Sequence, residues 1–167
     1  ARIGAQVHLL PPGQFDPSDL SAARTVWDGN ILRGPGVQIP LIVDEDQDRG
    51  GAVTLVITWK FRERDFAQVV YIPTRKQYSA FGLGINRGDS SVVNENLYYV
   101  LKKISCDYGV PIVANAKLTE RPSVIDVGEG SLDDALRNSL RPIGLDWLFS
   151  DKAIYIDREY DVSGPLP

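Results

Sequence analysis

Leucines recur at four-residue spacing in two segments of the chain, and each segment ends in a glycine. The pattern Leu-x3-Leu-x7-Gly occupies 97–109 and occurs again at 132–144. Further apolar residues follow at three- and four-residue spacing, which places them on one face of a helix. Glycine is favoured where a helix ends in the left-handed conformation. The pattern therefore predicts two amphipathic helices, one from Val93 to Tyr108 and one from Leu132 to Leu140.

The start of the second helix carries its own signal. Ser131 precedes the apolar face, and Asp134 follows three residues later. In a capping box the hydroxyl accepts a hydrogen bond from an early amide of the helix, while the acidic side chain reaches back to the capping residue. Ser131 and Asp134 are therefore expected to begin this helix.

Short segments rich in β-branched and aromatic residues surround both helices. Such residues are typical of strands, and turn formers separate one segment from the next. Upstream of the helices, Ala52–Phe61 and Phe66–Pro73 flank a charged turn and predict an antiparallel hairpin. The strands expected further along are Tyr78–Ile85, Val110–Ala114, Ser123–Val127 and a closing hairpin of Leu145–Phe149 with Ala153–Ile156.

Residues 1–40 are rich in proline and glycine. Proline removes a backbone donor and glycine relaxes the backbone, so long regular elements are not expected there. Pro17 followed by polar residues favours a short helix at 17–27. Val37–Val43 is apolar enough for a strand, although Pro40 interrupts it. We interpret this region as an arm that wraps around the rest of the chain.

The order strand, helix, glycine, strand, strand, helix, glycine, strand and strand resembles the secretin and TonB short N-terminal domain (STN, or N0-like domain). The resemblance covers about Gln77–Arg158, and Cys106 and Pro142 depart from the usual pattern. It implies two helices packed on small mixed sheets in the order βαββαββ. The residues at matching positions are Ser131, Leu132, Ala135, Leu136, Leu140, Gly144, Leu145, Trp147, Ile154 and Ile156.

The expected fold class is α+β. The resemblance implies an N0/STN-like domain at 77–160, preceded by a Pro/Gly-rich arm and β-hairpin extension at 1–76 and followed by a tail at 161–167. It also implies a non-catalytic docking role in a bacterial cell-envelope machine for secretion, conjugation or type IV pilus assembly. Members of the family act in the periplasm or at the outer membrane through protein–protein contacts, often in oligomeric rings.

Other roles stay open at this point. The resemblance also admits the periplasmic signalling domain of a TonB-dependent receptor, and related folds occur in phage and contractile-injection baseplates. A small hydrolase with a carboxylate pair is the enzyme alternative, since the chain has 22 acidic residues. It has neither a nucleophile motif nor a second histidine beside His8, which counts against that alternative.

Composition and net charge limit the kinds of partner that the chain is expected to bind. A net charge of -4 argues against a surface that binds nucleic-acid phosphates. No run approaches 18 apolar residues, so no membrane-spanning segment is expected. The single cysteine, Cys106, excludes an internal disulfide. The chain starts at Ala1 and contains no Met, which suggests a processed product and is compatible with a lipid anchor upstream.

Few residues lie in patterns that indicate catalysis or metal binding, and no cofactor is predicted. Asp44, Asp46 and Asp48 match the first three ligands of a calcium loop. The rest of that pattern fails, because Arg49 replaces its glycine and Leu55 replaces its bidentate glutamate. We therefore interpret the acidic run, residues 44–51, as a solvated turn at the end of a hairpin.

The expected docking surfaces are exposed strand edges and the upstream hairpin. Five aromatic residues alternate along the predicted strands, so that some of them are expected to face outward. These candidate partner-docking residues are Trp59, Phe61, Tyr71, Trp147 and Phe149.

Overall fold

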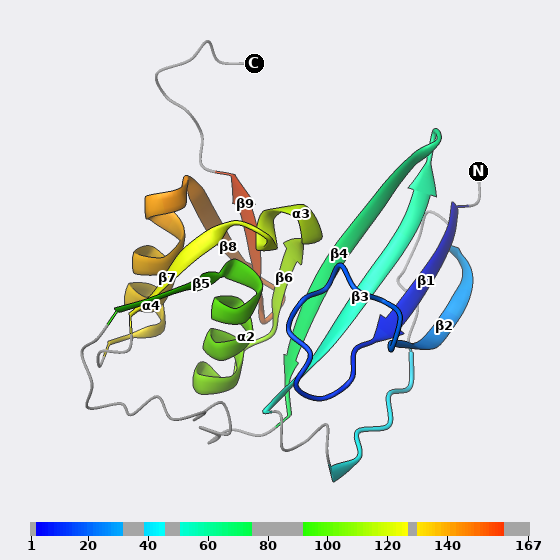
Figure 1. The fold of residues 1–167 in the computed structure, drawn as a ribbon, viewed down its shortest axis with the longest axis horizontal. Helices are drawn as coiled ribbons and strands as arrows, with labels where there is room; N and C mark the ends of the chain where they lie inside the picture. The colour runs from blue at the N-terminus through cyan, green and yellow to red at the C-terminus, as the bar shows by residue number, and fades with distance from the viewer. Residues whose placement is uncertain (1–2, 32–38, 46–50, 75–91, 127–129, 159–167) are drawn as a thin grey trace.

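A computed structural model describes residues 3–31, 39–45, 51–74, 92–126 and 130–158 of the chain. A seven-stranded sheet, in the order β2-β1-β3-β4-β6-β9-β8, runs through the molecule, and a second sheet pairs β5 with β7. The helices α2 and α4 contact both sheets (Figure 1). The fold is therefore α+β, as the sequence predicts.

Four strands from the first half of the chain form one end of the large sheet. The first of them contradicts the prediction that 1–40 lacks long regular elements, because Ala5, Val7 and Leu9 alternate along it and are buried. The helix predicted at 17–27 is also absent, since a strand begins at Arg24. Residues 39–43 belong to no strand, and 37–38 lie outside the described residues. The four strands are β1 (Ile3–Leu9), β2 (Arg24–Ile31), β3 (Ala52–Phe61) and β4 (Arg64–Pro73).

The large sheet continues from these strands into the second half of the chain. Strand β4 pairs antiparallel with β6 (Ile112–Asn115), from Gln68 opposite Asn115 to Tyr71 opposite Ile112. Strand β6 pairs parallel with β9 (Ala153–Arg158), and β9 pairs antiparallel with β8 (Leu145–Ser150). The upstream hairpin is therefore part of the same sheet as the closing hairpin.

Residues 92–158 contain the predicted helices, with one corrected boundary. The first helix begins at Leu97 instead of Val93, because Val92 and Val93 are β-branched and pair with a later strand. The predicted strand Tyr78–Ile85 lies outside the described residues. The remaining elements are β5 (Val92–Asn96), α2 (Leu97–Tyr108), the one-turn α3 (Ala116–Thr119), β7 (Pro122–Asp126), α4 (Leu132–Leu140) and a 3-10 turn, η2 (Arg141–Ile143).

The predicted helix ends are confirmed. Gly109 follows α2 with φ 66° and Gly144 follows η2 with φ 75°, both left-handed. The Asp134 amide donates to Ser131 Oγ at 3.1 Å, and the Ser131 amide donates to Asp134 Oδ2 at 3.3 Å, which is the capping box. None of the described helices has the length and apolar character needed to cross a membrane.

The main core lies between the two helices and one face of the large sheet. Tyr71, Ile112 and Ile154 are directly paired on β4, β6 and β9, so their side chains project to the same face. All three are buried together with Leu101 of α2 and Leu136 of α4. Because this core includes β4, the upstream hairpin and the helices are held by one set of apolar contacts.

Candidate functional site

The five aromatic docking candidates fall in three places. Tyr71 is fully buried, and burial raises the pKa of its hydroxyl far above the ordinary value. This core position removes Tyr71 from any docking surface. Trp59 and Phe61 lie near the turn between β3 and β4, whereas Trp147 and Phe149 lie on β8 at the far edge of the sheet.

The turn between β3 and β4 projects beyond the neighbouring strands. Pairing of β1 with β3 begins at Ala5 opposite Trp59, and pairing of β6 with β4 stops at Gln68. Residues 60–67, called the hairpin tip below, therefore extend past both neighbours, as Figure 1 shows. Arg62 and Glu63 form the turn, and both have positive φ.

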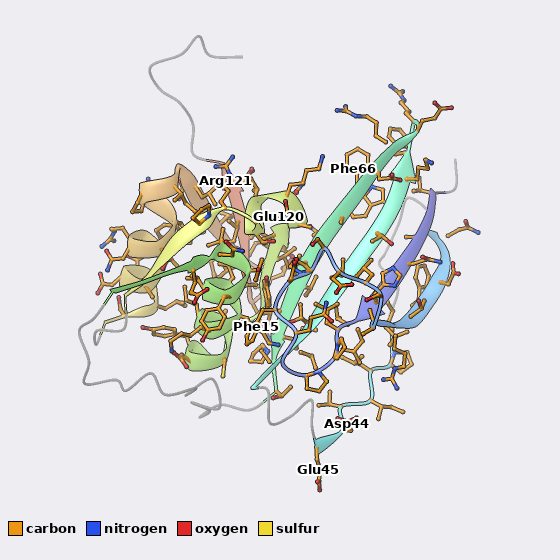
Figure 2. The ribbon with its side chains drawn as sticks, viewed as in Figure 1. Phe15, Asp44, Glu45, Phe66, Glu120 and Arg121 are labelled. Carbon is orange, nitrogen blue, oxygen red and sulfur yellow. The ribbon has the colours of Figure 1, made fainter. Side chains whose placement is uncertain are left out.

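Aromatic and basic side chains gather around the hairpin tip. The rings of Trp59 and Phe66 are stacked, with centroids 5.6 Å apart. Phe61 is 43% exposed, and the guanidinium of Arg62 lies 5.2 Å from the centre of its ring. Figure 2 labels Phe66, which comes from the β4 side of this group.

A groove of about 750 Å³ lies beside the hairpin tip. Its volume is within the range of ordinary ligand pockets. Strands β1 and β2 contribute Gln6 and Asp28, and β3 contributes Thr58. On the opposite side, Arg64 of β4 and Lys117 of α3 line the groove. The rings of Trp59 and Phe66 also line the groove, so its lining combines apolar surface with charges of both signs.

Strand β8 exposes two large apolar side chains at the end of the sheet. Leu148 is 66% exposed and Phe149 is 62% exposed. Tyr155, directly opposite Leu148 on β9, is also exposed. Among the described strands, β8 pairs with β9 alone. This outer edge with Leu148 and Phe149 is called the β8 edge below.

Trp147 is held differently from its neighbour Leu148. It is half-buried and packs against the main core. The guanidinium of Arg141 lies 5.2 Å from the centre of its ring and forms an ion pair with Asp146 at 3.2 Å. Trp147 is therefore mainly a packing residue, whereas Phe149 remains available for contact.

The loop between β1 and β2 reaches across to α2. Phe15 packs against Tyr99 with ring centroids 4.7 Å apart and ring planes tilted by 47°, and Lys102 Nζ lies 5.1 Å from the centre of the Phe15 ring. Figure 2 shows Phe15 beside α2. Burial lowers the pKa of Lys102 to about 8, although the neighbouring Cys106 acts in the opposite direction. This contact was not predicted from the sequence.

His8 lies in strand β1 and has a packing role. Its Nε2 lies 3.0 Å from the hydroxyl oxygen of Thr58, and its Nδ1 lies 3.3 Å from that of Thr25. The described residues include no group of three or more His, Cys, Asp or Glu side chains suited to a metal ion. Of the calcium-loop candidates, Asp44 is exposed (Figure 2), while Asp46 and Asp48 lie outside the described residues.

Several surface residues escaped the sequence prediction. Leu148, Phe66 and Tyr155 were not singled out, although Leu148 lies between Trp147 and Phe149, Phe66 lies opposite Trp59, and Tyr155 lies opposite Leu148. Arg64 and Lys117 carried no motif, and only the folded arrangement brings them to one groove.

Comparison of the chain with protein-family models, with curated proteins and with solved structures finds no match. A function must therefore be inferred from the chain's own surfaces, which are the hairpin tip with its groove and the β8 edge.

Proposed function

We propose that this chain is a non-catalytic protein–protein docking component of a bacterial cell-envelope machine of the secretion, conjugation or type IV pilus class. The observation that carries the proposal is the β8 edge, where Leu148 and Phe149 are 66% and 62% exposed. Large apolar side chains on an unpaired strand edge favour contact with another protein. In this role the chain works in the periplasm or at the outer membrane.

The order of elements supports the envelope part of the proposal. From β5 to β9 the chain runs strand, helix, strand, strand, helix, strand, strand, apart from the one-turn α3 and the 3-10 turn η2. The N0-like domain, to which this half of the sequence is similar, has the same order. Members of that family act by docking.

The occupant that we assign to the β8 edge is a second copy of this chain. Leu148 and Phe149 are consecutive residues of a strand, so they project to opposite faces of the sheet. A second β8 strand alongside would cover both faces at once. The stretch Trp147–Ser150 contains neither a charge nor a proline, the residues with which natural edge strands prevent such pairing.

An antiparallel arrangement keeps like charges of the two copies apart. Asp146 is the one charged residue of β8, and it is paired with Arg141 of its own chain at 3.2 Å. In an antiparallel pair the start of one strand lies beside the end of the other. The two Asp146 side chains would therefore lie at opposite ends of the pair, whereas parallel strands would place them side by side.

Replacing Leu148 and Phe149 together by aspartate is expected to abolish self-association. The wild-type chain should shift from the mass of one chain towards that of two as its concentration rises, with a dissociation constant on the order of 10–100 µM for a small contact. The double variant should stay at the mass of one chain, because two charges would enter the paired edge. Static light scattering over a concentration series measures both masses.

Tyr108→Asp is the matched control, since Tyr108 is an exposed aromatic residue on α2 and lies outside the β8 edge. It should associate like the wild type. A wild-type chain that stays monomeric at millimolar concentration would overturn the assignment of a second copy to this edge. Equal loss of association in the control variant would show that the contact lies elsewhere.

A further inference from the structure

One side of strand β4 is only partly paired. Strand β3 pairs with β4 along its whole length, from Arg64 to Pro73. On the other side β6 pairs only from Gln68 to Tyr71, so residues 64–67 have no strand beside them in the described part of the chain. In an antiparallel ladder about half of the residues direct their amide and carbonyl groups away from a given neighbour. Some backbone donors and acceptors of this stretch therefore have no strand partner in the described part of the chain.

The open stretch exists because β6 ends early. Asn115, the last residue of β6, accepts a hydrogen bond through its side-chain oxygen from the Lys117 amide at 2.9 Å and so caps α3. The chain then turns into α3 instead of continuing beside Arg64–Ala67. The groove of about 750 Å³ extends over β1, β2 and β3 and borders this space, where its lining includes Arg64–Ala67, Asn115 and Lys117.

The charges along the open stretch are mainly positive. Arg64 and Lys117 border it from β4 and α3, and neither forms an ion pair with another described residue. Asp65 lies directly opposite Lys60 on β3, which offsets its charge. Asp28 lies at the other side of the groove on β2 and accepts a hydrogen bond from Gln6 at 3.1 Å. An occupant with acidic side chains would complement Arg64 and Lys117.

We propose that the open stretch of β4, residues 64–67, binds an extended acidic segment of a partner protein by strand addition. The segment lies in the space that a longer β6 would fill, with its backbone paired to β4 and its acidic side chains near Arg64 and Lys117. A membrane surface fits the open stretch less well, because an extended peptide offers backbone donors and acceptors at the spacing of a strand and a lipid surface does not. This site is separate from the β8 edge and does not require the second copy assigned there.

A synthetic hexapeptide of alternating glutamate and valine, blocked at both ends, tests the proposal with the full chain. We expect saturable binding with a dissociation constant on the order of 100 µM by fluorescence anisotropy. Hydrogen exchange of the amides at 64–67 should slow when the peptide is bound. A peptide with proline in place of each valine keeps the charge but lacks half of the backbone donors, and it should bind at least tenfold more weakly.

Charge reversal on the protein separates this site from general electrostatic attraction. Arg64→Glu and Lys117→Glu should each weaken binding about five- to tenfold. Arg24→Glu makes the same change at an exposed position at the start of β2, outside the groove and the β8 edge, and it should leave the affinity unchanged.

Three outcomes would overturn the proposal. One is equal binding of the proline peptide by the wild-type chain, a result that does not depend on the folding of any variant. Another is equal weakening by Lys117→Glu and Arg24→Glu. The third is binding to vesicles of anionic phosphatidylglycerol that Phe61→Ser removes, with no peptide binding, which would assign the hairpin tip to a lipid surface.

Discussion

Replacing Leu136 by aspartate is expected to unfold the chain. Leu136 is 2% exposed and lies in the core that α2, α4 and the large sheet share. A buried unpaired carboxylate costs several kcal/mol, and the lost leucine contacts add about 2–5 kcal/mol. A domain of this size has about 5–15 kcal/mol of stability in total. The substitution should therefore abolish the cooperative thermal transition seen by circular dichroism.

Asn138→Asp is the matched control for this prediction. It introduces the same charge two residues along α4, at an exposed position. Its melting temperature should stay within a few degrees of the wild type. A melt of the Leu136→Asp chain that matches the wild type would show that α4 does not pack on the sheet as described. Because Val69 and Tyr71 of β4 belong to the same core, the loss should extend to the upstream hairpin.

Replacing Lys102 by methionine is expected to stabilise the chain at pH 7. Lys102 is 3% exposed, and burial lowers its pKa from 10.5 to about 8. Below pH 8 the folded chain therefore holds a charged ammonium in a buried position. The lowering of this pKa means that burial disfavours the charged form of Lys102 by about 3 kcal/mol. Methionine has a similar length and helix propensity without the charge. The free energy of unfolding should therefore rise by about 1–3 kcal/mol, reduced by the contribution of the lost contact between Lys102 and Phe15.

The stability advantage of Lys102→Met should depend on pH, and the lowered pKa of Lys102 fixes the direction of that dependence. Between pH 8 and about 10 the unfolded chain keeps the Lys102 proton that the folded chain has released, so the wild type gains stability as the pH rises. The advantage of Lys102→Met should therefore shrink from pH 8 to 10 in urea unfolding measurements. Lys103→Met, where the lysine is paired with Asp107, controls for the Lys-to-Met change itself. A constant advantage of Lys102→Met from pH 7 to 10 would contradict the buried position of the ammonium.

Features that depend on neighbouring residues in the chain were predicted well. The capping box of Ser131 and Asp134 and the left-handed Gly109 and Gly144 involve contacts within a few residues, which the sequence records directly. The closing hairpin of β8 and β9 was predicted for the same reason, since its two strands are separated by only Asp151 and Lys152.

Features that depend on distant pairing were missed. Strand β1 is stabilised by pairing with β3, where His8 lies opposite Val56. The prolines that argued against a strand, Pro11 and Pro17, lie in the loop that follows β1. Residues 93–96, four of the five residues of β5, were predicted as helix because their partner strand, β7, lies beyond α2. Tertiary pairing overrides local propensity in both cases.

The candidate surfaces were predicted only in part for a similar reason. Phe61 and Phe149 were chosen as aromatic strand residues, and both are exposed. Exposure of Leu148 depends on β8 being the last strand of the sheet, which follows from the strand order and not from the local sequence. The open stretch at 64–67 depends on where β6 ends relative to β4.

Cross-linking through Leu148→Cys in the native envelope fraction tests the docking role most directly. Cys106 is fully buried, so it should not compete for oxidation. If two copies pair through β8 in a cell-envelope assembly, mild oxidation of the isolated envelope fraction should join Leu148→Cys chains into a disulfide-linked dimer. The same treatment should leave Tyr108→Cys chains, with an exposed cysteine on α2, as monomers. Absence of the dimer, or equal cross-linking of both variants, would contradict docking through β8.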